Sequence, residues 1–142
     1  MTIFRRGAPG DLGAVAAIQQ ASPEMPQWPV GDYLAYDLLV AERDGRVCGF
    51  LSARTVADGE NELLNLAVAP EDRRRGIARG LIHELFVLRR GSIFLEVRES
   101  NHAARSLYQS MGFREIHIRP KYYDKPRESG IVMTHYRSRQ VA

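Results

Sequence analysis

Cysteine is almost absent from this chain, and long hydrophobic runs are missing. The single cysteine, Cys48, excludes an internal disulfide, and no Cys/His cluster has the spacing of zinc ligands, so we expect no structural metal. Cys48 lies in an apolar run, residues 47–51, which favours a buried and unreactive thiol. No stretch approaches the ~18 consecutive apolar residues of a membrane-spanning helix, and no membrane partner is expected.

Length, composition and charge narrow the class of protein further. The first seven residues show no apolar segment before a cleavage site, so we expect no secretory signal and a cytoplasmic location. A chain of 142 residues with 44% hydrophobic and 26% charged residues predicts one globular domain, residues 1–142. The net charge of +3 and the pI of 9.3 suit an anionic partner. A nucleotide-like cofactor, RNA and an acidic protein all meet that description.

Hydrophobic periodicity and turn residues predict a mixture of strands and helices. Asp11 is a plausible N-cap for a helix that starts at Leu12 and ends before Ser22, and Asp44-Gly45 predicts a hairpin. Residues 120–129 read as a polar loop, and residues 137–142 as a frayed tail. We predict strands at 2–6, 37–42, 46–55, 62–69, 92–97, 113–119 and 130–136, and further helices at 30–36, 78–88 and 102–111.

The sharpest local feature is a basic turn between a predicted strand and a predicted helix. It holds three consecutive arginines followed closely by two small residues: Arg73, Arg74, Arg75, Gly76 and Ala78. Small residues let a phosphate approach the backbone, and free N–H groups at a helix N-terminus favour an anion. Arginines can add charge-assisted hydrogen bonds. A triple arginine is also typical of a solvated surface, so the turn alone leaves both interpretations open.

Two segments resemble the GNAT superfamily of N-acetyltransferases. Arg73, Gly76 and Ala78 match the family's pyrophosphate-loop pattern, Arg/Gln-x-x-Gly-x-Gly/Ala, with alanine in place of the second glycine. Residues 95–113, LEVRESNHAARSLYQSMGF, are similar to the RimI branch, the ribosomal-protein N-terminal-alanine acetyltransferases. Residues 62–68 and the pair Tyr122-Tyr123 match as well. The resemblance spans about residues 46–136, although the connection between Gly76 and Glu96 is short for this branch.

The resemblance implies a set of site residues. It implies that the strand before the basic turn pairs with the pantetheine arm of acetyl-CoA, and that the turn holds the pyrophosphate. In the RimI branch the glutamate that matches Glu96 accepts a proton, and the tyrosine that matches Tyr108 donates one. The implied cofactor-binding residues are Leu66, Ala67, Val68, Arg73, Arg74, Arg75, Gly76, Ile77, Ala78, Arg79, Asn101 and Ala104.

The residue chemistry is compatible with these roles but does not require them. Asn101, Ala104 and Tyr108 are spaced three and four apart and share one helix face. There they could line a groove for pantetheine, or Asn101 could be an N-cap and Tyr108 a half-buried core aromatic. Glu96 interrupts an apolar strand, where a carboxylate could deprotonate an attacking ammonium. Strand alternation would equally place Glu96 toward solvent.

We therefore expect an α+β GNAT fold, a mixed and mostly antiparallel sheet with splayed central parallel strands and flanking helices. The expected activity is direct transfer of acetyl from acetyl-CoA to a peptide or protein N-terminus, with a ribosomal protein as the implied acceptor. We expect no metal and no direct nucleic-acid partner. The alternatives are a small-molecule amine or a protein lysine as acceptor, and a non-catalytic acetyl-CoA sensor or RNA-binding module. Tyr122, Tyr123 and Arg127 are candidates for shaping peptide selectivity.

Overall fold

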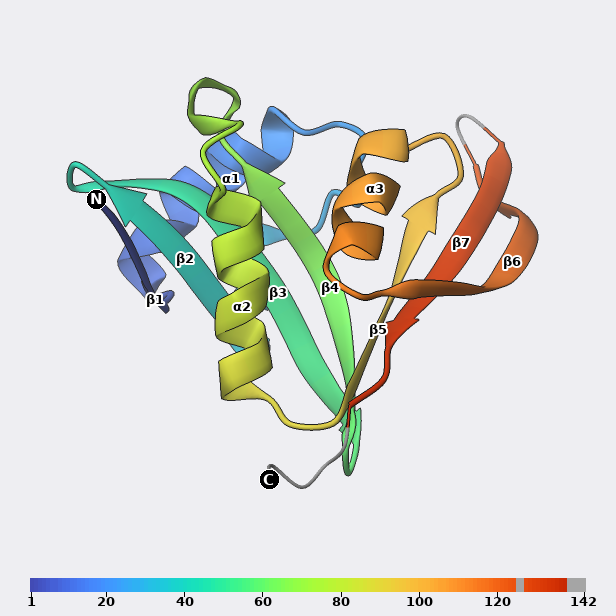
Figure 1. Cartoon of the computed structure of the whole chain (residues 1–142). Helices are drawn as coiled ribbons and strands as arrows, with labels where there is room; N and C mark the ends of the chain where they lie inside the picture. The colour runs from blue at the N-terminus through green and yellow to red at the C-terminus, as the bar shows by residue number, and fades with distance from the viewer. Residues whose placement is uncertain (125–126, 138–142) are drawn as a thin grey trace. The chain divides into compact units, whose positions relative to one another are not determined.

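The computed structural model describes residues 1–124 and 127–137, except for the side chain of Lys121. In these residues seven strands and three α-helices follow one another, with short 3-10 turns at Pro9–Asp11, Val30–Ala35 and Pro70–Asp72 (Figure 1). The elements are β1 (Thr2–Arg6), α1 (Leu12–Gln20), β2 (Asp37–Arg43), β3 (Arg46–Ala57), β4 (Glu60–Val68), α2 (Ile77–Leu88), β5 (Ser92–Arg98), α3 (His102–Ser110), β6 (Arg114–Tyr123) and β7 (Glu128–His135).

The strands form a mixed sheet in the order β1-β2-β3-β4-β5-β7-β6. Antiparallel pairs join β1 to β2, β2 to β3, β5 to β7 and β6 to β7. Strands β4 and β5 are parallel, and their ladder comprises three residue pairs, from Glu60 opposite Ser92 to Glu62 opposite Phe94. A mixed and mostly antiparallel sheet with one parallel pair agrees with the prediction.

The chain divides into two compact units, and β4 runs through both of them. The first unit consists of residues 1–54 and 63–89, and the second of residues 55–62 together with the described residues from 90 onward. The prediction of a single domain over residues 1–142 stays a prediction.

In the first unit, α1 and α2 each bury apolar side chains. Helix α2 buries Ile77, Leu81, Ile82 and Leu85, which recur at helical spacing on one face. Each such side chain, fully buried, contributes roughly 1.5–3 kcal/mol. A Cβ atom at Gly80 would lie 2.1 Å from the ring of Phe4, so the glycine allows α2 to lie close against β1. In Figure 1, α2 lies in front of the strands of this unit.

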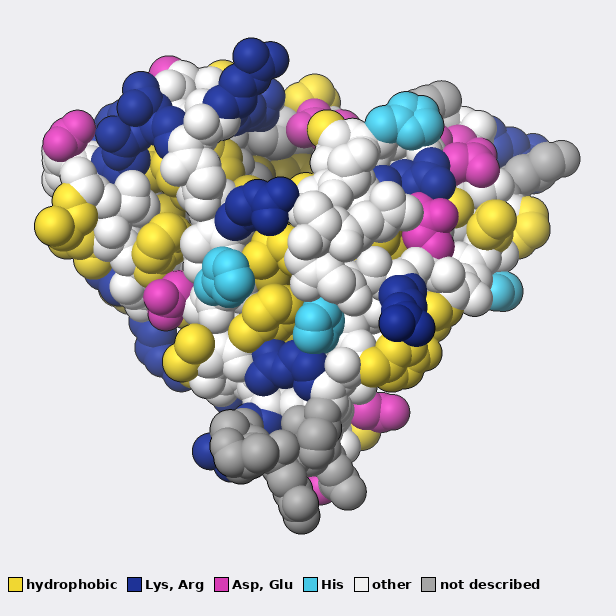
Figure 2. Space-filling model, in the orientation of Figure 1, with side chains coloured by type: hydrophobic (Ala, Val, Ile, Leu, Met, Phe, Trp, Pro, Cys, Tyr) yellow, Lys and Arg dark blue, Asp and Glu magenta, His cyan; other side chains and the backbone are white. Residues whose placement is uncertain are grey.

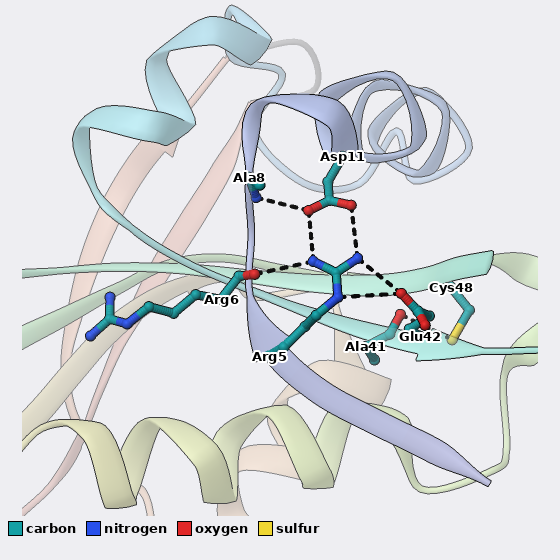
Figure 3. A network of polar contacts seen from close by, with 7 residues as sticks. All are labelled: Arg5, Arg6, Ala8, Asp11, Ala41, Glu42 and Cys48. Carbon is teal, nitrogen blue, oxygen red and sulfur yellow. Dashed lines mark hydrogen bonds and ion pairs between the residues drawn. The ribbon is translucent and has the colours of Figure 1, made fainter. Parts of the chain in front are cut away.

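A partly buried network of ion pairs joins β1, the 3-10 turn Pro9–Asp11 and β2 (Figure 3). The guanidinium of Arg5 donates to both carboxylate oxygens of Asp11, at 2.8 and 2.9 Å, and to Oε1 of Glu42 at 3.0 Å. The hydrogen bond from Arg5 lowers the pKa of Asp11. Asp11 occupies the N-cap position of α1, but its side chain makes no capping hydrogen bond there and accepts instead from the backbone N–H of Ala8. The predicted cap is therefore wrong in its chemistry.

In the second unit, β5 and β7 are hydrogen-bonded neighbours in the sheet. Ile93, Leu95 and Val97 alternate along β5 and are buried, with Ile131 and Met133 of β7 in the same core. A separate polar contact holds the start of β5. Buried Asn61 donates to the backbone carbonyls of Arg90 and Ser92 at 2.9 and 3.2 Å, and accepts from the hydroxyl of Thr55.

Most predicted elements are present, with shifted ends. The exception is the predicted loop 120–129, because β6 continues through Pro120 to Tyr123 and β7 already begins at Glu128. Proline is tolerated there because β6 is an edge strand, and the pairing with β7 shifts register between Arg119 and Tyr123. The predicted helix at 30–36 is a 3-10 helix. Of the predicted tail, residues 138–142 lie outside the described residues.

None of the helices in the described residues is long and apolar enough to cross a bilayer. Cys48 is fully buried, as predicted, and burial raises the pKa of its thiol.

Candidate active site

The basic turn that precedes α2 has the backbone of an anion-binding loop. Gly76 is the N-cap residue of α2 and has a φ of +76°, a left-handed conformation that glycine adopts without strain. The first hydrogen bond of the helix runs from Gly80 N–H to Gly76 C=O, so the N–H groups of Ile77 and Ala78 have no acceptor within the helix. A Cβ atom at Gly76 would meet nothing within 4 Å, which means that the helix N-terminus is open above this residue.

Arginine side chains surround this turn. Arg73, Arg74, Arg75 and Arg79 are all exposed, and Figure 2 shows basic side chains gathered over the loop between β4 and α2. Arg74 has a φ of +66°, which is uncommon for a residue other than glycine. Arg73 folds back, because its Nε donates to the carbonyl of Val68 at 3.2 Å. A solvated arginine surface and an open helix N-terminus therefore occur together.

The base of the turn is anchored by a buried carboxylate. Asp72 is 3% exposed and receives two hydrogen bonds from Arg46, at 2.9 and 3.2 Å. Arg43 adds a longer ion pair at 3.8 Å. The hydrogen bonds from Arg46 lower the pKa of Asp72. Because Asp72 directly precedes the arginines, its contacts with β2 and β3 hold the start of the basic turn in place.

The end of β4 leads into the same turn. Ala67 faces the core, whereas Leu66 and Val68 are half-buried on the opposite face. A Cβ atom at Gly49 of β3 would lie 3.2 Å from the carbonyl oxygen of Ala67, so the two backbones approach closely. These three residues and the turn all belong to the first unit.

Helix α3, in the second unit, carries the three residues predicted to share a face. Asn101 is its N-cap, and Oδ1 of Asn101 accepts from the N–H of Ala104 at 3.2 Å. Tyr108 is 7% exposed and packs on Phe113, with ring centroids 5.6 Å apart. The capping and packing alternatives are thus both present. Burial raises the pKa of Tyr108, so its phenol keeps its proton at neutral pH.

Glu96 lies on the less buried face of β5, together with Phe94 and Arg98. Strand alternation therefore directs the Glu96 side chain to this face, yet the side chain is only 19% exposed. Oε1 of Glu96 accepts from Nη1 of Arg119 at 2.8 Å, while Oε2 is buried without a hydrogen-bond partner among the described residues. The side-chain hydrogen bond of Glu96 is with Arg119 of β6, and no side-chain hydrogen bond joins Glu96 to Tyr108 among those residues.

Around Glu96 lies a cluster of arginines and tyrosines that the sequence analysis did not assemble. Arg119 stacks over the ring of Tyr122 at 3.6 Å, and Arg98 over the ring of Tyr123 at 4.4 Å. Arg98 also pairs with Glu128 at 3.1 Å. Burial raises the pKa of Tyr123 to about 12. Period-two alternation could have placed Arg98 beside Glu96, but nothing in the sequence indicates which β6 residue reaches β5.

In chemical terms, the two units supply different functions. The first supplies an open helix N-terminus with arginines, which suits a phosphate-bearing ligand. The second supplies a largely covered carboxylate, a protonated phenol and two tyrosine rings, each of which lies under an arginine. No group of three or more His, Cys, Asp or Glu side chains that could hold a metal ion occurs in the described part of the chain. Anion binding and proton transfer are both steps that group transfer from a phosphate-bearing donor requires.

Comparison with known proteins supports that reading. Residues 35–115 match the family model described as acetyltransferase (GNAT) domain. The [ribosomal protein bS18]-alanine N-acetyltransferase of Escherichia coli strain K12 is 39% identical over 107 residues, which is 71% of this chain and 70% of that protein. The crystal structure of the ribosomal-protein-S18-alanine N-acetyltransferase from Escherichia coli superposes with a TM-score of 0.87 and 31% identity, covering 100% of this chain and 97% of that one.

A more distant solved structure bears on the cofactor. Arabidopsis thaliana NAA60 in complex with acetyl-CoA has a TM-score of 0.82 at 20% identity, covering 96% of this chain and 99% of that one. At that identity the match shows a shared fold, and acetyl-CoA binding is a property of that protein. The chain itself belongs to the GNAT acetyltransferase family, and it is an N-acetyltransferase with the predicted α+β GNAT fold.

Proposed function

We propose that this enzyme transfers the acetyl group of acetyl-CoA directly to the α-amino group at a protein N-terminus, with a ribosomal protein that begins with alanine as the acceptor. The observation that supports it most is the end-to-end match with an alanine N-acetyltransferase of that class. The cluster around Glu96 supports it independently, because a covered carboxylate beside aromatic rings suits an amine that must lose a proton. A cytoplasmic location remains part of the same prediction.

In this proposal the first unit binds most of acetyl-CoA. The pyrophosphate is held by the N–H groups of Ile77 and Ala78 and by the exposed arginines Arg73, Arg74, Arg75 and Arg79. It can approach the backbone at Gly76, which has a positive φ and open space where a side chain would stand. The backbone of Leu66, Ala67 and Val68 pairs with the pantetheine arm. From the second unit, Asn101 and Ala104 at the start of α3 complete the set of cofactor-binding residues.

In the same proposal, Glu96 is the proton acceptor and Tyr108 is the proton donor. An α-amino group has a pKa of about 7.7–8.0 and is mostly ammonium at neutral pH, so Glu96 accepts its proton. The amine nitrogen forms a bond to the acetyl carbon, the carbon–sulfur bond breaks, and Tyr108 gives its proton to the departing thiolate. Backbone N–H groups of β4 polarise the carbonyl during this step. Because burial raises the pKa of Tyr108, the phenol is protonated before each turnover.

The test is an acetylation assay on matched peptides, read by mass spectrometry. One peptide begins with a free alanine and contains an internal lysine, a second is the same peptide with a blocked N-terminus, and a third begins with a free alanine but has arginine in place of lysine. We expect the first and third peptides to be acetylated at the N-terminus and the second to be unmodified. If only lysine were acetylated, or only small amines offered in parallel, the acceptor would be that amine and not the protein N-terminus. Binding of acetyl-CoA without any turnover would indicate a sensor.

A further inference from the structure

The two carboxylate oxygens of Glu96 have different surroundings. Oε1 receives a charge-assisted hydrogen bond of 2.8 Å from Arg119, whereas Oε2 is buried and has no hydrogen-bond partner among the described residues. A buried acceptor without a donor is unfavourable, so it gains free energy from any donor that reaches it. The geometry thus separates one oxygen that is held by a hydrogen bond from one oxygen that has none among the described residues.

Arg119 is itself held in a defined orientation. It lies on β6 directly opposite Gly130 of β7, and its guanidinium stacks 3.6 Å above the ring centre of Tyr122. The hydrogen bond to Glu96 raises the pKa of Arg119. A planar guanidinium that stacks on a ring and donates to a carboxylate has less freedom than an exposed arginine normally has. Arg119 can therefore fix the rotation of the carboxyl group to which it is bonded.

Gly130 supplies the space for the second oxygen. A Cβ atom at this position would lie 2.4 Å from Oε2 of Glu96 and 3.2 Å from the ring of Tyr123. The backbone of Gly130 does not have a positive φ, so this glycine is needed for room and not for conformation. The hydrogen bond from Arg119 thus holds Oε1, and the absence of a side chain at Gly130 leaves room for Oε2.

We propose that Arg119 is a positioning residue for the acetyl transfer: by binding Oε1 of Glu96, it leaves Oε2 as the oxygen that accepts the proton of the acceptor amine, directly or through one water. The donor that Oε2 lacks in the free enzyme is then the acceptor's own ammonium or the water that relays its proton. This inference rests on the proposed function of Glu96 as proton acceptor. It adds Arg119 and Gly130 as the residues that set which oxygen performs that function.

A double-mutant cycle tests the inference. Arg119→Gln and Arg119→Lys are made in the wild-type chain and in Glu96→Gln, with Arg114→Gln as a control that removes an exposed arginine from the same strand. Turnover on the best peptide is measured together with the KM for acetyl-CoA and the melting temperature. Displacing a catalytic group by about 1 Å can lower the rate roughly 100-fold, so we expect Arg119→Gln to lower kcat by about 10- to 100-fold. Arg119→Lys should keep more turnover, because it keeps the charge.

The decisive outcome is the dependence on Glu96. If Arg119 acts through Glu96, Arg119→Gln lowers kcat in the wild-type chain but causes no further loss in Glu96→Gln, while the KM for acetyl-CoA stays unchanged. An equal loss in both backgrounds, or no loss in the wild-type chain, overturns the inference and leaves the proposed function standing. If Glu96→Gln itself keeps wild-type turnover, the proposed function of Glu96 fails, and the inference fails with it.

Gly130→Ala provides a second route that leaves Arg119 in place. The new methyl group meets the end of the Glu96 side chain first and the ring of Tyr123 at 3.2 Å; because the Glu96 side chain can move aside, the melting temperature should change little. The carboxylate is displaced instead, and we expect kcat to fall while the KM for acetyl-CoA is kept. Wild-type turnover in Gly130→Ala with an intact fold would show that the placement of Oε2 does not matter, and would overturn the inference even if Arg119→Gln were impaired.

Discussion

At the scale of single residues, Tyr108 combines a buried ring with a polar group at its end. Its ring packs on Phe113, and its hydroxyl forms no hydrogen bond to another side chain within the described residues. Burial raises the pKa of Tyr108, so the hydroxyl is a proton donor over the whole neutral range. A packing role and a chemical role are therefore compatible in this residue, and a substitution that removes only the hydroxyl separates them.

Tyr108→Phe should keep the fold and lose turnover. Phenylalanine preserves the packing on Phe113, so the melting temperature and the affinity for acetyl-CoA should remain close to those of the wild-type enzyme. General acid catalysis typically contributes about 10² to 10⁴ in rate, and we expect kcat to fall within that range. Calorimetric binding and steady-state kinetics on the same preparation provide the check. A variant that binds acetyl-CoA normally and turns over at the wild-type rate would assign Tyr108 to packing alone.

Glu96→Gln should lower turnover in a way that depends on pH. Glutamine keeps the shape of the side chain but cannot accept the proton of the ammonium, so the loss of kcat/KM should be largest near pH 7. As the pH rises past about 8, free amine becomes available without a base, and the loss should shrink. The matched control is Glu99→Gln, which removes an exposed carboxylate three residues further along. A loss that is constant from pH 6.5 to 9.5 would contradict a function in proton removal.

At the scale of elements, local patterns predict what local interactions determine. The alternation in β5, the spacing along α3 and the glycine before α2 are properties of neighbouring residues, and the structure contains all three. The length of β6 is different. Proline has no backbone N–H, so Pro120 would end a strand only at a position that must donate a ladder hydrogen bond, and the sequence does not reveal that β6 is an edge strand. The pairing of Glu96 with Arg119 spans 23 residues and depends on the β5-β7-β6 order. No local pattern encodes it.

The turn before α2 leads to a prediction about charge. Arg74→Glu combined with Arg75→Glu should weaken acetyl-CoA binding, and the weakening should be greatest at low salt because exposed charges are screened as salt rises. Isothermal titration at about 20 and 200 mM salt measures the effect. A pair of exposed arginines outside the turn, Arg90 and Arg114, changed in the same way, controls for net charge. Equal affinities for the two double variants would remove these arginines from the proposed pyrophosphate site.

At the scale of the whole molecule, arginine–carboxylate pairs recur through both units. Examples are Arg5 with Asp11, Arg46 with Asp72, Arg89 with Asp37, Arg98 with Glu128 and Arg105 with Glu115. The carboxylates with a lowered pKa include Asp11 and Asp72, each through a hydrogen bond from its arginine. Such groups stabilise the folded state above their ordinary pKa, and that stability is lost as the pH falls through the lowered folded value.

Acid should therefore reduce the stability of this protein in part through Asp72. Urea unfolding measured from pH 7 to pH 3 should show the wild-type free energy of unfolding falling below about pH 4. Asp72→Asn should be less stable at pH 7 and should lose less on acidification, so the two curves converge. Asp44→Asn, in an exposed turn with a φ of +52°, is the control and should follow the wild-type curve. Parallel curves for wild type and Asp72→Asn would mean that the ion pair contributes nothing to acid sensitivity.

The packing of the segment between α1 and β2 has an optical consequence. Trp28 is the only tryptophan in the chain, and it stacks on Tyr33 with ring centroids 5.9 Å apart while Tyr36 meets it edge-on at 5.7 Å. The hydroxyl of Tyr33 is in turn bonded to Gln19 and Asn65, and the backbone carbonyl of Trp28 accepts from Gln19. Tryptophan emission from this protein therefore comes from Trp28 alone. With excitation at the red edge of the absorption band, that emission reports on the segment between α1 and β2 without labelling.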